Sequence, residues 1–250
     1  MPTSGGSIRL FRIAGIEVFL HWSWFLVAIY EVQQWRAIFS SPVWAAVLYL
    51  GLFVLVTMHE FGHALACRQT GGQAEKIFLW PLGGIAFVSP PPRPGPMLWS
   101  IAAGPLVNVL LVPILAFAQS AAARAGWVNT NVDAYLVITW LRRINLGLLI
   151  FNLLPIYPLD GGQILRSLLW FPFGQIRSLF IATAIGFAGG VALLLGAIWW
   201  QSFWIGFMAF FLLSRAGMGW KQARYLQAEE TEMTRVAAPE PELPEKKAVL

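Results

Sequence analysis

The chain is poor in cysteine and in charge, and each shortage excludes a class of protein. Cys67 is the only cysteine among 250 residues, which excludes an intrachain disulfide and a zinc site built from cysteines. Charged residues make up 12% and are scattered between apolar runs, so we expect no nucleic-acid partner. We also expect no cleavable signal peptide, because the first apolar run contains His21 and Glu31 and lacks a small-residue cleavage site.

Long apolar runs, by contrast, are abundant. Hydrophobic residues account for 58% of the chain, which has 13 tryptophans and a mean hydropathy of +0.65. This composition is typical of multi-pass membrane proteins. We therefore predict an all-α multi-pass protein of the cell membrane, with a core domain over residues 1–225 that contacts the lipid bilayer. Its six expected spans cover approximately residues 17–35, 43–66, 97–123, 144–159, 179–196 and 197–214.

Two stretches have no helical period. Residues 1–16 alternate weakly between apolar and polar positions, which predicts a short strand or an interfacial segment. Between the second and third spans, residues 76–80 and 85–89 have the pattern of two strands around a turn at 81–84. This predicts a small membrane-associated β-hairpin or sheet, to whose edge an extended peptide could add. The alternative for this stretch is a plain connecting loop.

Charge divides the chain into a basic body and an acidic tail. Residues 1–225 contain 14 basic and 6 acidic side chains, whereas residues 226–250 contain 3 and 6. The tail is rich in proline and glutamate, which predicts disorder. Six spans place both termini on the same side of the membrane. Ten of the basic residues before the tail lie on that side, and four basic residues lie on the other side. The positive-inside rule then predicts that both termini are cytoplasmic.

The run from Val43 to Ala66 contains the sequence HEFGH and is long enough to cross a bilayer core of about 30 Å. His59 and His63 are four residues apart and so lie on one helix face. Glu60 lies beside them, placed to take a proton from a water activated by a metal. The structural alternative is a buried helix with satisfied polar groups. Ionisable groups in a membrane span cost at least a few kcal/mol each and mark functional cavities, which favours zinc chemistry.

A catalytic zinc takes three protein ligands and keeps one open position. Asp160 is the only other carboxylate in an apolar span with helix-breaking residues around it, and along the predicted helices it lies at a depth comparable to that of His59. We therefore expect one zinc ion bound by His59, His63 and Asp160, with Glu60 as the general base. The same ligand types also bind cobalt or manganese.

Two further polar residues lie in apolar runs. Asn108 in the third span could hold a substrate backbone or an oxyanion, or could form a hydrogen bond between helices. His21 lies among tryptophans, where a lone histidine is more often a hydrogen-bonded interfacial group than a ligand.

Together these motifs resemble the site-2 protease family of intramembrane zinc metalloproteases. HEFGH (59–63) matches the family's HExxH, and NLLPIYPLDGG (152–162) matches its LDG motif, with Asp160 at the third-ligand position. AAGPLVN (102–108) and PLGGIAF (81–87) are similar to the GP-and-Asn segment and the glycine-containing strand region of the family. On this resemblance, the residues expected at a substrate-binding or oxyanion position are Gly83, Gly84, Asn108 and Asn152.

The resemblance implies hydrolysis of a membrane-spanning or membrane-proximal protein substrate, commonly in the regulated release of a tethered factor. The chain has no room for a PDZ insertion or a CBS pair, so it is similar to a minimal core of the family. Two other functions are a metal-ion transporter and a catalytically inactive scaffold. The transporter gives no reason for Glu60 beside the ligands, and the complete ligand set argues against the scaffold.

Overall fold

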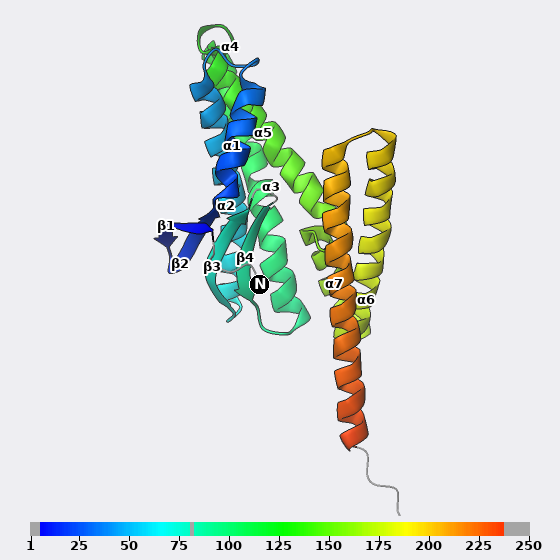
Figure 1. Cartoon of the computed structure of the whole chain (residues 1–250). Coiled ribbons are helices and arrows are strands. Elements are labelled where there is room, and N and C mark those ends of the chain that lie inside the picture. The colour runs from blue at the N-terminus through cyan, green and yellow to red at the C-terminus, as the bar shows by residue number, and fades with distance from the viewer. Residues whose placement is uncertain (1–5, 81–82, 238–250) are drawn as a thin grey trace, which may run out of the picture.

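The computed structural model describes residues 6–80 and 83–237, which form a helical protein with one small sheet (Figure 1). The helices are α1 (Ser23–Trp35), α2 (Pro42–Gln69), α3 (Pro94–Arg124), α4 (Trp127–Thr130), α5 (Val132–Leu153), α6 (Asp160–Trp199) and α7 (Phe203–Ala237). The strands are β1 (Ser7–Ile13), β2 (Ile16–His21), β3 (Gln73–Trp80) and β4 (Gly83–Ser89).

Five helices, α2, α3, α5, α6 and α7, are long and apolar enough to cross a membrane. Only 17–33% of the most apolar stretch of each is buried inside the protein. The remaining surface carries large apolar side chains such as Phe117 and Ile198, which are 70% and 69% exposed. Such a surface suits contact with lipid rather than water, and the predicted multi-pass helical architecture is confirmed.

The predicted sheet is present and larger than a hairpin. Its strand order is β1-β2-β3-β4, with β2 and β3 parallel and the other two pairs antiparallel. Alternate side chains of β2 and β3 point inward and pack against α2 in one apolar cluster. Strand β4 is an edge of the sheet and also contacts α2. The sheet therefore lies directly beside the helix that contains HEFGH.

The first predicted span, 17–35, is wrong at its start. Ile16, Val18 and Leu20 are buried and alternate with less buried residues, so this stretch forms strand β2. Helix α1 contains only 13 residues, about 20 Å, and is too short to cross the bilayer core alone. The described part of the chain thus has five helices of spanning length, where six were expected.

The fourth predicted span, 144–159, also has different limits. Helix α5 runs from Val132 to Leu153, so it begins 12 residues before the predicted span. It ends where Pro155 disfavours helical geometry at Leu154, whose ψ is 132°. Asp160 consequently lies at the start of α6 and not at the end of the fourth span.

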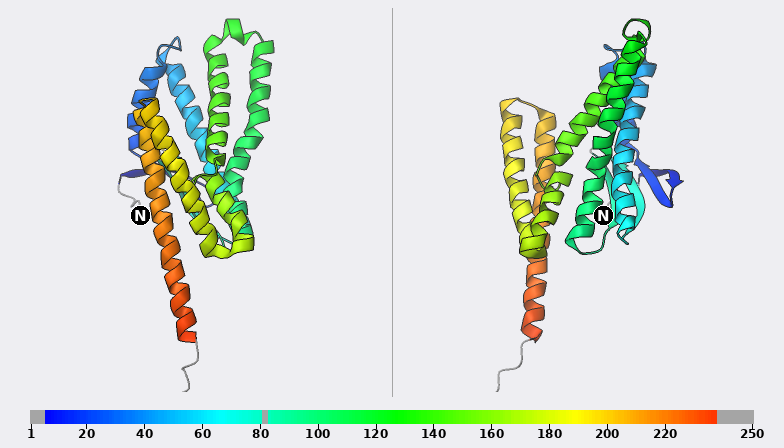
Figure 2. Two further views of the ribbon diagram at one scale, coloured as in Figure 1. Left: turned by 90° about the vertical axis from the view of Figure 1, so that its right-hand side faces the viewer. Right: turned by 180° about the vertical axis from the view of Figure 1, so that it is seen from behind.

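Helices α6 and α7 form a hairpin beside the rest of the molecule (Figures 1 and 2). The predicted fifth span, 179–196, is the second part of α6, after a break at Gly174. The predicted sixth span lies mostly within α7. The expectation of a disordered tail is wrong for residues 226–237, because good helix formers such as Gln227 and Met233 continue α7 to Ala237. Residues 238–250 lie outside the described part.

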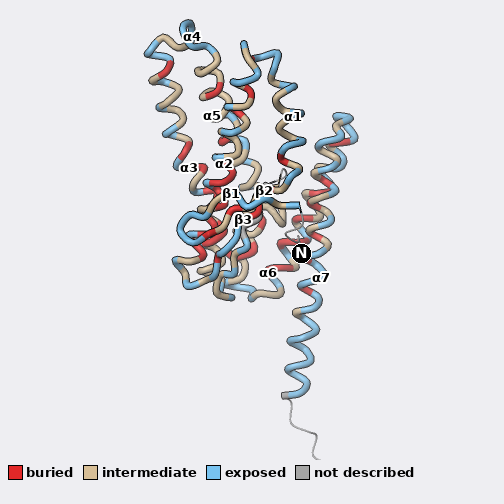
Figure 3. The backbone as a smooth tube through the Cα atoms, turned by 60° about the vertical axis from the view of Figure 1, so that its left-hand side comes forward, coloured by how far each residue is buried: buried red, intermediate tan, exposed pale blue. Residues whose placement is uncertain are grey.

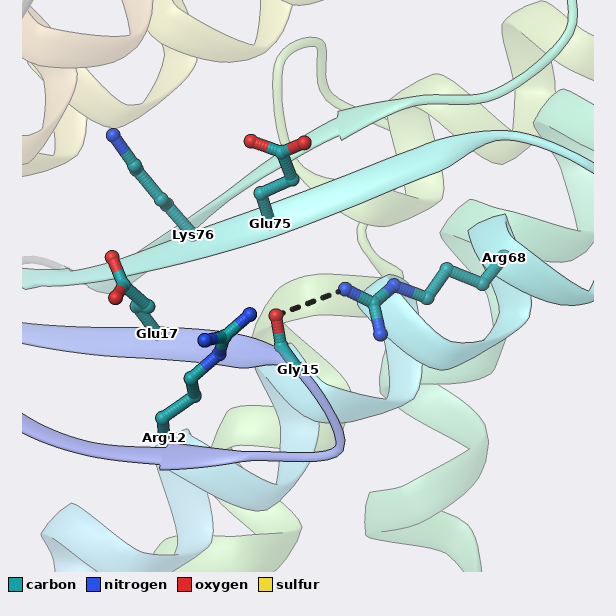
Figure 4. A pocket seen from close by; sticks show the side chains of 6 residues that line it. All are labelled: Arg12, Gly15, Glu17, Arg68, Glu75 and Lys76. Atoms are coloured by element: carbon teal, nitrogen blue, oxygen red, sulfur yellow. Dashed lines mark hydrogen bonds between the residues drawn. The ribbon is translucent and has the colours of Figure 1, made fainter.

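Arg68 joins the sheet to the end of α2. Its guanidinium donates hydrogen bonds to the backbone carbonyls of Ala74 (2.8 Å), Gly15 (3.2 Å) and Ala14. Figure 4 shows this arginine reaching the β1–β2 turn. The position of the sheet is therefore fixed about one and a half helical turns from His63.

Candidate metal centre

The two histidines of HEFGH lie on the inner side of α2. His59 and His63 are 6% and 8% exposed, and their Nε2 atoms are 3.1 Å apart. Buried residues gather in the region where α2, α3 and the sheet meet (Figure 3). The i, i+4 spacing thus delivers two imidazole nitrogens to one buried point, as the sequence predicts.

Asp160 meets the histidines from the start of α6. Its Oδ2 lies 3.1 Å from His59 Nε2 and 3.5 Å from His63 Nε2. This oxygen is buried and has no hydrogen-bond partner within the described residues. The three residues together form a group positioned to hold a metal ion.

The donor distances fit a tetrahedral zinc site. Nitrogen and oxygen ligands at about 2.0–2.1 Å from zinc lie about 3.3–3.4 Å from one another in a tetrahedron. The three measured separations, 3.1, 3.1 and 3.5 Å, are close to that edge length. The residues therefore fit zinc in their chemistry and in their spacing.

The protonation of His63 also fits a metal ligand. Its Nδ1 lies 2.9 Å from the backbone carbonyl oxygen of Ser100 on α3. A carbonyl oxygen can only accept, so Nδ1 must carry the proton. In the neutral ring Nε2 then presents a lone pair toward Asp160, which is the form that binds a metal.

His59 is held by a pair of asparagines. Its Nδ1 lies 2.6 Å from Asn108 Oδ1, and Asn108 Nδ2 donates to Asn145 Oδ1 at 2.8 Å. Asn145 Nδ2 donates in turn to the backbone carbonyl oxygen of Asn108 at 3.0 Å. Both asparagines are fully buried. The amide of Asn108 therefore acts as an interhelical hydrogen-bonding group in contact with His59, which is the structural alternative for this residue.

Gly104 provides the space for His63. A Cβ atom at this position of α3 would lie 2.2 Å from His63 Nε2 and 2.3 Å from its Cε1. Contacts this short are impossible, so only glycine lets α3 approach α2 this closely at the site. The imidazole thus occupies the volume that a side chain at position 104 would fill.

Glu60 shares the buried environment of the two histidines. It is 6% exposed and follows His59 directly on α2. Burial of a carboxylate beside two imidazoles inside an apolar helix is the arrangement expected at a functional site rather than in a structural core.

The remaining predicted residues lie outside the His–His–Asp group. Asn152 is half-buried in the last turn of α5, and Gly83 and Gly84 begin β4, paired with Trp80 and Leu79. His21 stacks on Trp80, with ring centroids 3.8 Å apart, and its Nδ1 is hydrogen-bonded to Ser23 Oγ at 2.5 Å. This matches the expected hydrogen-bonded role of that histidine.

Asn145 and Ser100, which complete the site, were missed by the sequence analysis, whereas Gly104 was noticed only as part of the AAGPLVN motif (102–108). Asn145 is a polar side chain in an apolar run, a signal that could have been noticed. Ser100 contributes a backbone carbonyl and Gly104 contributes empty space. Neither contribution depends on a reactive side chain, so residue chemistry alone does not reveal them.

A separate charged pocket lies at the end of the sheet, and its side chains are drawn in Figure 4. Among its lining residues, Glu17 is directly opposite both Arg12 and Lys76 in the strand register and forms an ion pair with Arg9. None of its lining residues belongs to the His–His–Asp group. The residues that line it are Arg12, Gly15, Glu17, Arg68, Glu75 and Lys76.

Comparison with known proteins gives one consistent family. The family model for peptidase family M50 matches residues 47–128 and 118–197. A zinc metalloprotease of Methanocaldococcus jannaschii is 37% identical over 180 residues, which are 72% of this chain and 50% of that protein. Stage IV sporulation protein FB of Bacillus subtilis is 33% identical over 144 residues, 55% of this chain and 46% of that protein. The chain thus spans about half the length of these relatives.

A solved structure agrees with the sequence matches. The site-2 protease from Methanocaldococcus jannaschii has a TM-score of 0.62 and 30% sequence identity. The similarity covers 86% of this chain and 95% of that one. It therefore extends over the sheet and the spanning helices together, well beyond the two sequence motifs.

Proposed function

The chain belongs to peptidase family M50, and from this premise we propose that it is an intramembrane zinc metalloprotease. Its substrates are membrane proteins, and it hydrolyses peptide bonds within or near their transmembrane segments. One observation supports the proposal above all others. The His–His–Asp group is buried within helices apolar enough to span a bilayer, with Glu60 next to it.

His59, His63 and Asp160 are the metal ligands in this proposal. Three protein ligands leave one position open for water or substrate, as in other catalytic zinc sites. A bound zinc ion supplies Lewis acidity, which polarises a carbonyl group and makes water a nucleophile near neutral pH. The protein supplies the fixed orientation of the three donor atoms.

Glu60 is the proposed general base. It takes a proton from the attacking water and passes it to the leaving amine nitrogen. Val56, Glu60 and Ala64 follow one another four residues apart and so share one face of α2. Val56 and Ala64 on that face pack against β2 and β3. Glu60 therefore shares a face of α2 with residues of the apolar cluster that includes β2 and β3.

Strand β4 is the proposed docking edge for substrate. It pairs with β3 on one side and contacts α2, and within the described sheet its other side has no neighbouring strand. An extended peptide could add there by backbone hydrogen bonds. Gly83, Gly84 and Asn152 remain the candidates for holding the substrate backbone or an oxyanion. Asn108 no longer does, because it is fully buried and its amide is already bonded to His59 and Asn145.

An extended substrate requires that the substrate helix first unwinds. The peptide bonds of an intact helix are shielded by its own hydrogen-bonded turns. We expect preference for segments with glycine, proline or asparagine near the cleaved bond, because these residues lower the cost of unwinding.

Replacement of Glu60 by glutamine tests the proposal. Wild type and E60Q are reconstituted in liposomes with a tagged Leu/Ala transmembrane peptide that contains a central Asn-Gly-Pro segment. We expect E60Q to lose about 10²–10⁴-fold in cleavage rate, because glutamine cannot accept the proton. Its zinc content should equal that of wild type, because the three ligands are unchanged.

The uniform Leu/Ala peptide without the central segment is the matched control and should be cut more slowly. Cleavage by E60Q at the wild-type rate would contradict the role of Glu60. Zinc transport into the liposomes by both proteins, without peptide cleavage by either, would favour a transporter instead. Equal zinc content in wild type and Asp160→Asn would remove Asp160 from the ligand set.

A further inference from the structure

Asn145 is buried deep between helices, and within the described part of the chain it forms no hydrogen bond with a proposed metal ligand. It lies on α5, is fully buried, and forms its two hydrogen bonds with Asn108 alone. One bond goes to the side chain of Asn108 and the other to its backbone. A residue with this pair of contacts can control which way the Asn108 amide faces.

The backbone carbonyl of Asn108 fixes the orientation of the Asn145 side-chain amide, which in turn fixes the orientation of the Asn108 side-chain amide. It can only accept, so the group of Asn145 that faces it at 3.0 Å must be the Nδ2 amide nitrogen. The Oδ1 of Asn145 then faces the Asn108 side chain and requires a donor there, Nδ2 at 2.8 Å. The Oδ1 of Asn108 is thereby turned toward His59.

This orientation decides the tautomer of His59. An oxygen at 2.6 Å from Nδ1 requires a proton on Nδ1, which leaves the lone pair on Nε2 for a metal. If the Asn108 amide were turned over, its NH₂ group would face Nδ1. The proton would then move to Nε2, where it blocks coordination.

We propose that Asn145 is a positioning residue of the metal centre, which keeps His59 in its metal-binding tautomer by fixing the orientation of Asn108. The inference rests on the proposed ligand set and extends it to a third helix. His63 needs no such relay, since its Nδ1 donates directly to the Ser100 backbone carbonyl, a group that cannot be reversed.

The test compares zinc affinity among four variants, measured by competition with a chelator in detergent. Asn145→Ala should bind zinc about 10–100-fold more weakly, the usual effect of losing an outer-sphere partner. Asn108→Asp alone should also bind zinc more weakly, because its carboxylate would face Asn145 Oδ1, which needs a donor at that position. In the double variant Asn145→Ala/Asn108→Asp no acceptor faces the carboxylate, and both of its oxygens accept. No orientation then has to be fixed, so most of the affinity lost in Asn145→Ala should return.

Gln119→Ala is the matched control. Gln119 also joins α3 to α5, through Thr139 at 2.9 Å and Arg142 at 2.7 Å. It makes none of the contacts of the metal centre, so its loss should lower thermal stability while zinc affinity remains unchanged. The visible spectrum of the cobalt-substituted protein gives a second readout, which should change in Asn145→Ala and return in the double variant.

Wild-type zinc affinity in Asn145→Ala would overturn the inference. So would a loss of affinity that Asn108→Asp does not restore, because a packing role for Asn145 would not be rescued by a carboxylate at position 108. Either result would leave the proposed protease function standing, provided that wild type binds zinc and cleaves the peptide. A wild-type protein that binds no zinc would overturn both the inference about Asn145 and the proposed protease function.

Discussion

At the scale of single residues, hydrogen-bond acceptors orient the histidines of the metal centre. Two backbone carbonyls, those of Ser100 and Asn108, define the direction of the polar groups around the site. In their neutral forms both histidines present Nε2 lone pairs to the same point, where Asp160 adds a carboxylate oxygen. Three electron-rich atoms this close would repel one another, and a cation between them removes that repulsion.

Gly104→Ala tests how tightly His63 is held in place. The added methyl group would lie 2.2 Å from His63 Nε2, so the imidazole or α3 must move. We expect zinc affinity to fall by at least about tenfold, as displaced metal ligands lose their preset geometry. Gly95→Ala on the same helix is the control, because a Cβ there meets nothing within 4 Å. Equal zinc affinity in both variants would mean that the site has room that the structure does not show.

At the scale of helices, the break at Gly174 divides α6 into two parts that have different contacts. The part before Gly174 starts with Asp160 and carries it to the metal centre, and the part after it packs along α7. The two parts diverge at this break (Figure 2). Gly174 has φ 79° and ψ 171°, a conformation that only glycine adopts without strain.

Gly174→Ala should therefore strain the backbone without any clash. No atom lies within 4 Å of the added Cβ, so the expected loss of about 1–3 kcal/mol comes from the dihedral angles alone. Thermal unfolding in detergent would measure it. Gly147→Ala, in the middle of α5 and also without neighbours, has no positive φ and should be neutral or stabilising. A destabilisation shared by both variants would point to the loss of glycine in general and not to this break.

The sequence predicts the helices better than their junctions. Apolar length and the i, i+4 histidines identify α2 and α3 to within a few residues, because these signals are local. The strand at 16–21 was merged with the helix after it, since both are apolar and only the alternation of burial separates them. Asp160 was placed at the end of a span because residues 154–159 were assigned to that span, although Pro155 disfavours helical geometry at Leu154 and α5 ends at Leu153.

The site was predictable where it depends on chemistry. His59, His63 and Asp160 were identified as metal-binding candidates because ionisable groups are rare in apolar spans. In the support around them, only the interhelical hydrogen bonding of Asn108 was among the expectations. Its partner Asn145, the Ser100 carbonyl and the fit of His63 against Gly104 arise only in the folded structure. Contacts between α2, α3 and α5 create these partners, and they are far apart in sequence.

At the scale of the whole molecule, the exposed surface divides into a lipid-facing region and a projecting end. Many large apolar side chains of the five long helices are exposed, whereas the last turns of α7 are polar and extend away from the rest (Figure 3). Helix α7 has 35 residues, about 52 Å, which exceeds a bilayer core of about 30 Å. Its C-terminal part must therefore leave the membrane on one side.

The basic Lys221, Arg224 and Arg235 toward the C-terminal end of α7 predict that this side is the cytoplasm, and two matched cysteine substitutions test it. Gln201 lies in the turn between α6 and α7, and Gln227 lies 26 residues later on the projecting end, about 39 Å away along the helix; both are exposed. A membrane-impermeant maleimide should label Gln201→Cys in intact cells and Gln227→Cys only after permeabilisation. The native Cys67 is 0% exposed and should stay unlabelled in the folded protein. The opposite labelling pattern would reverse the orientation and place the projecting end of α7 outside the cell.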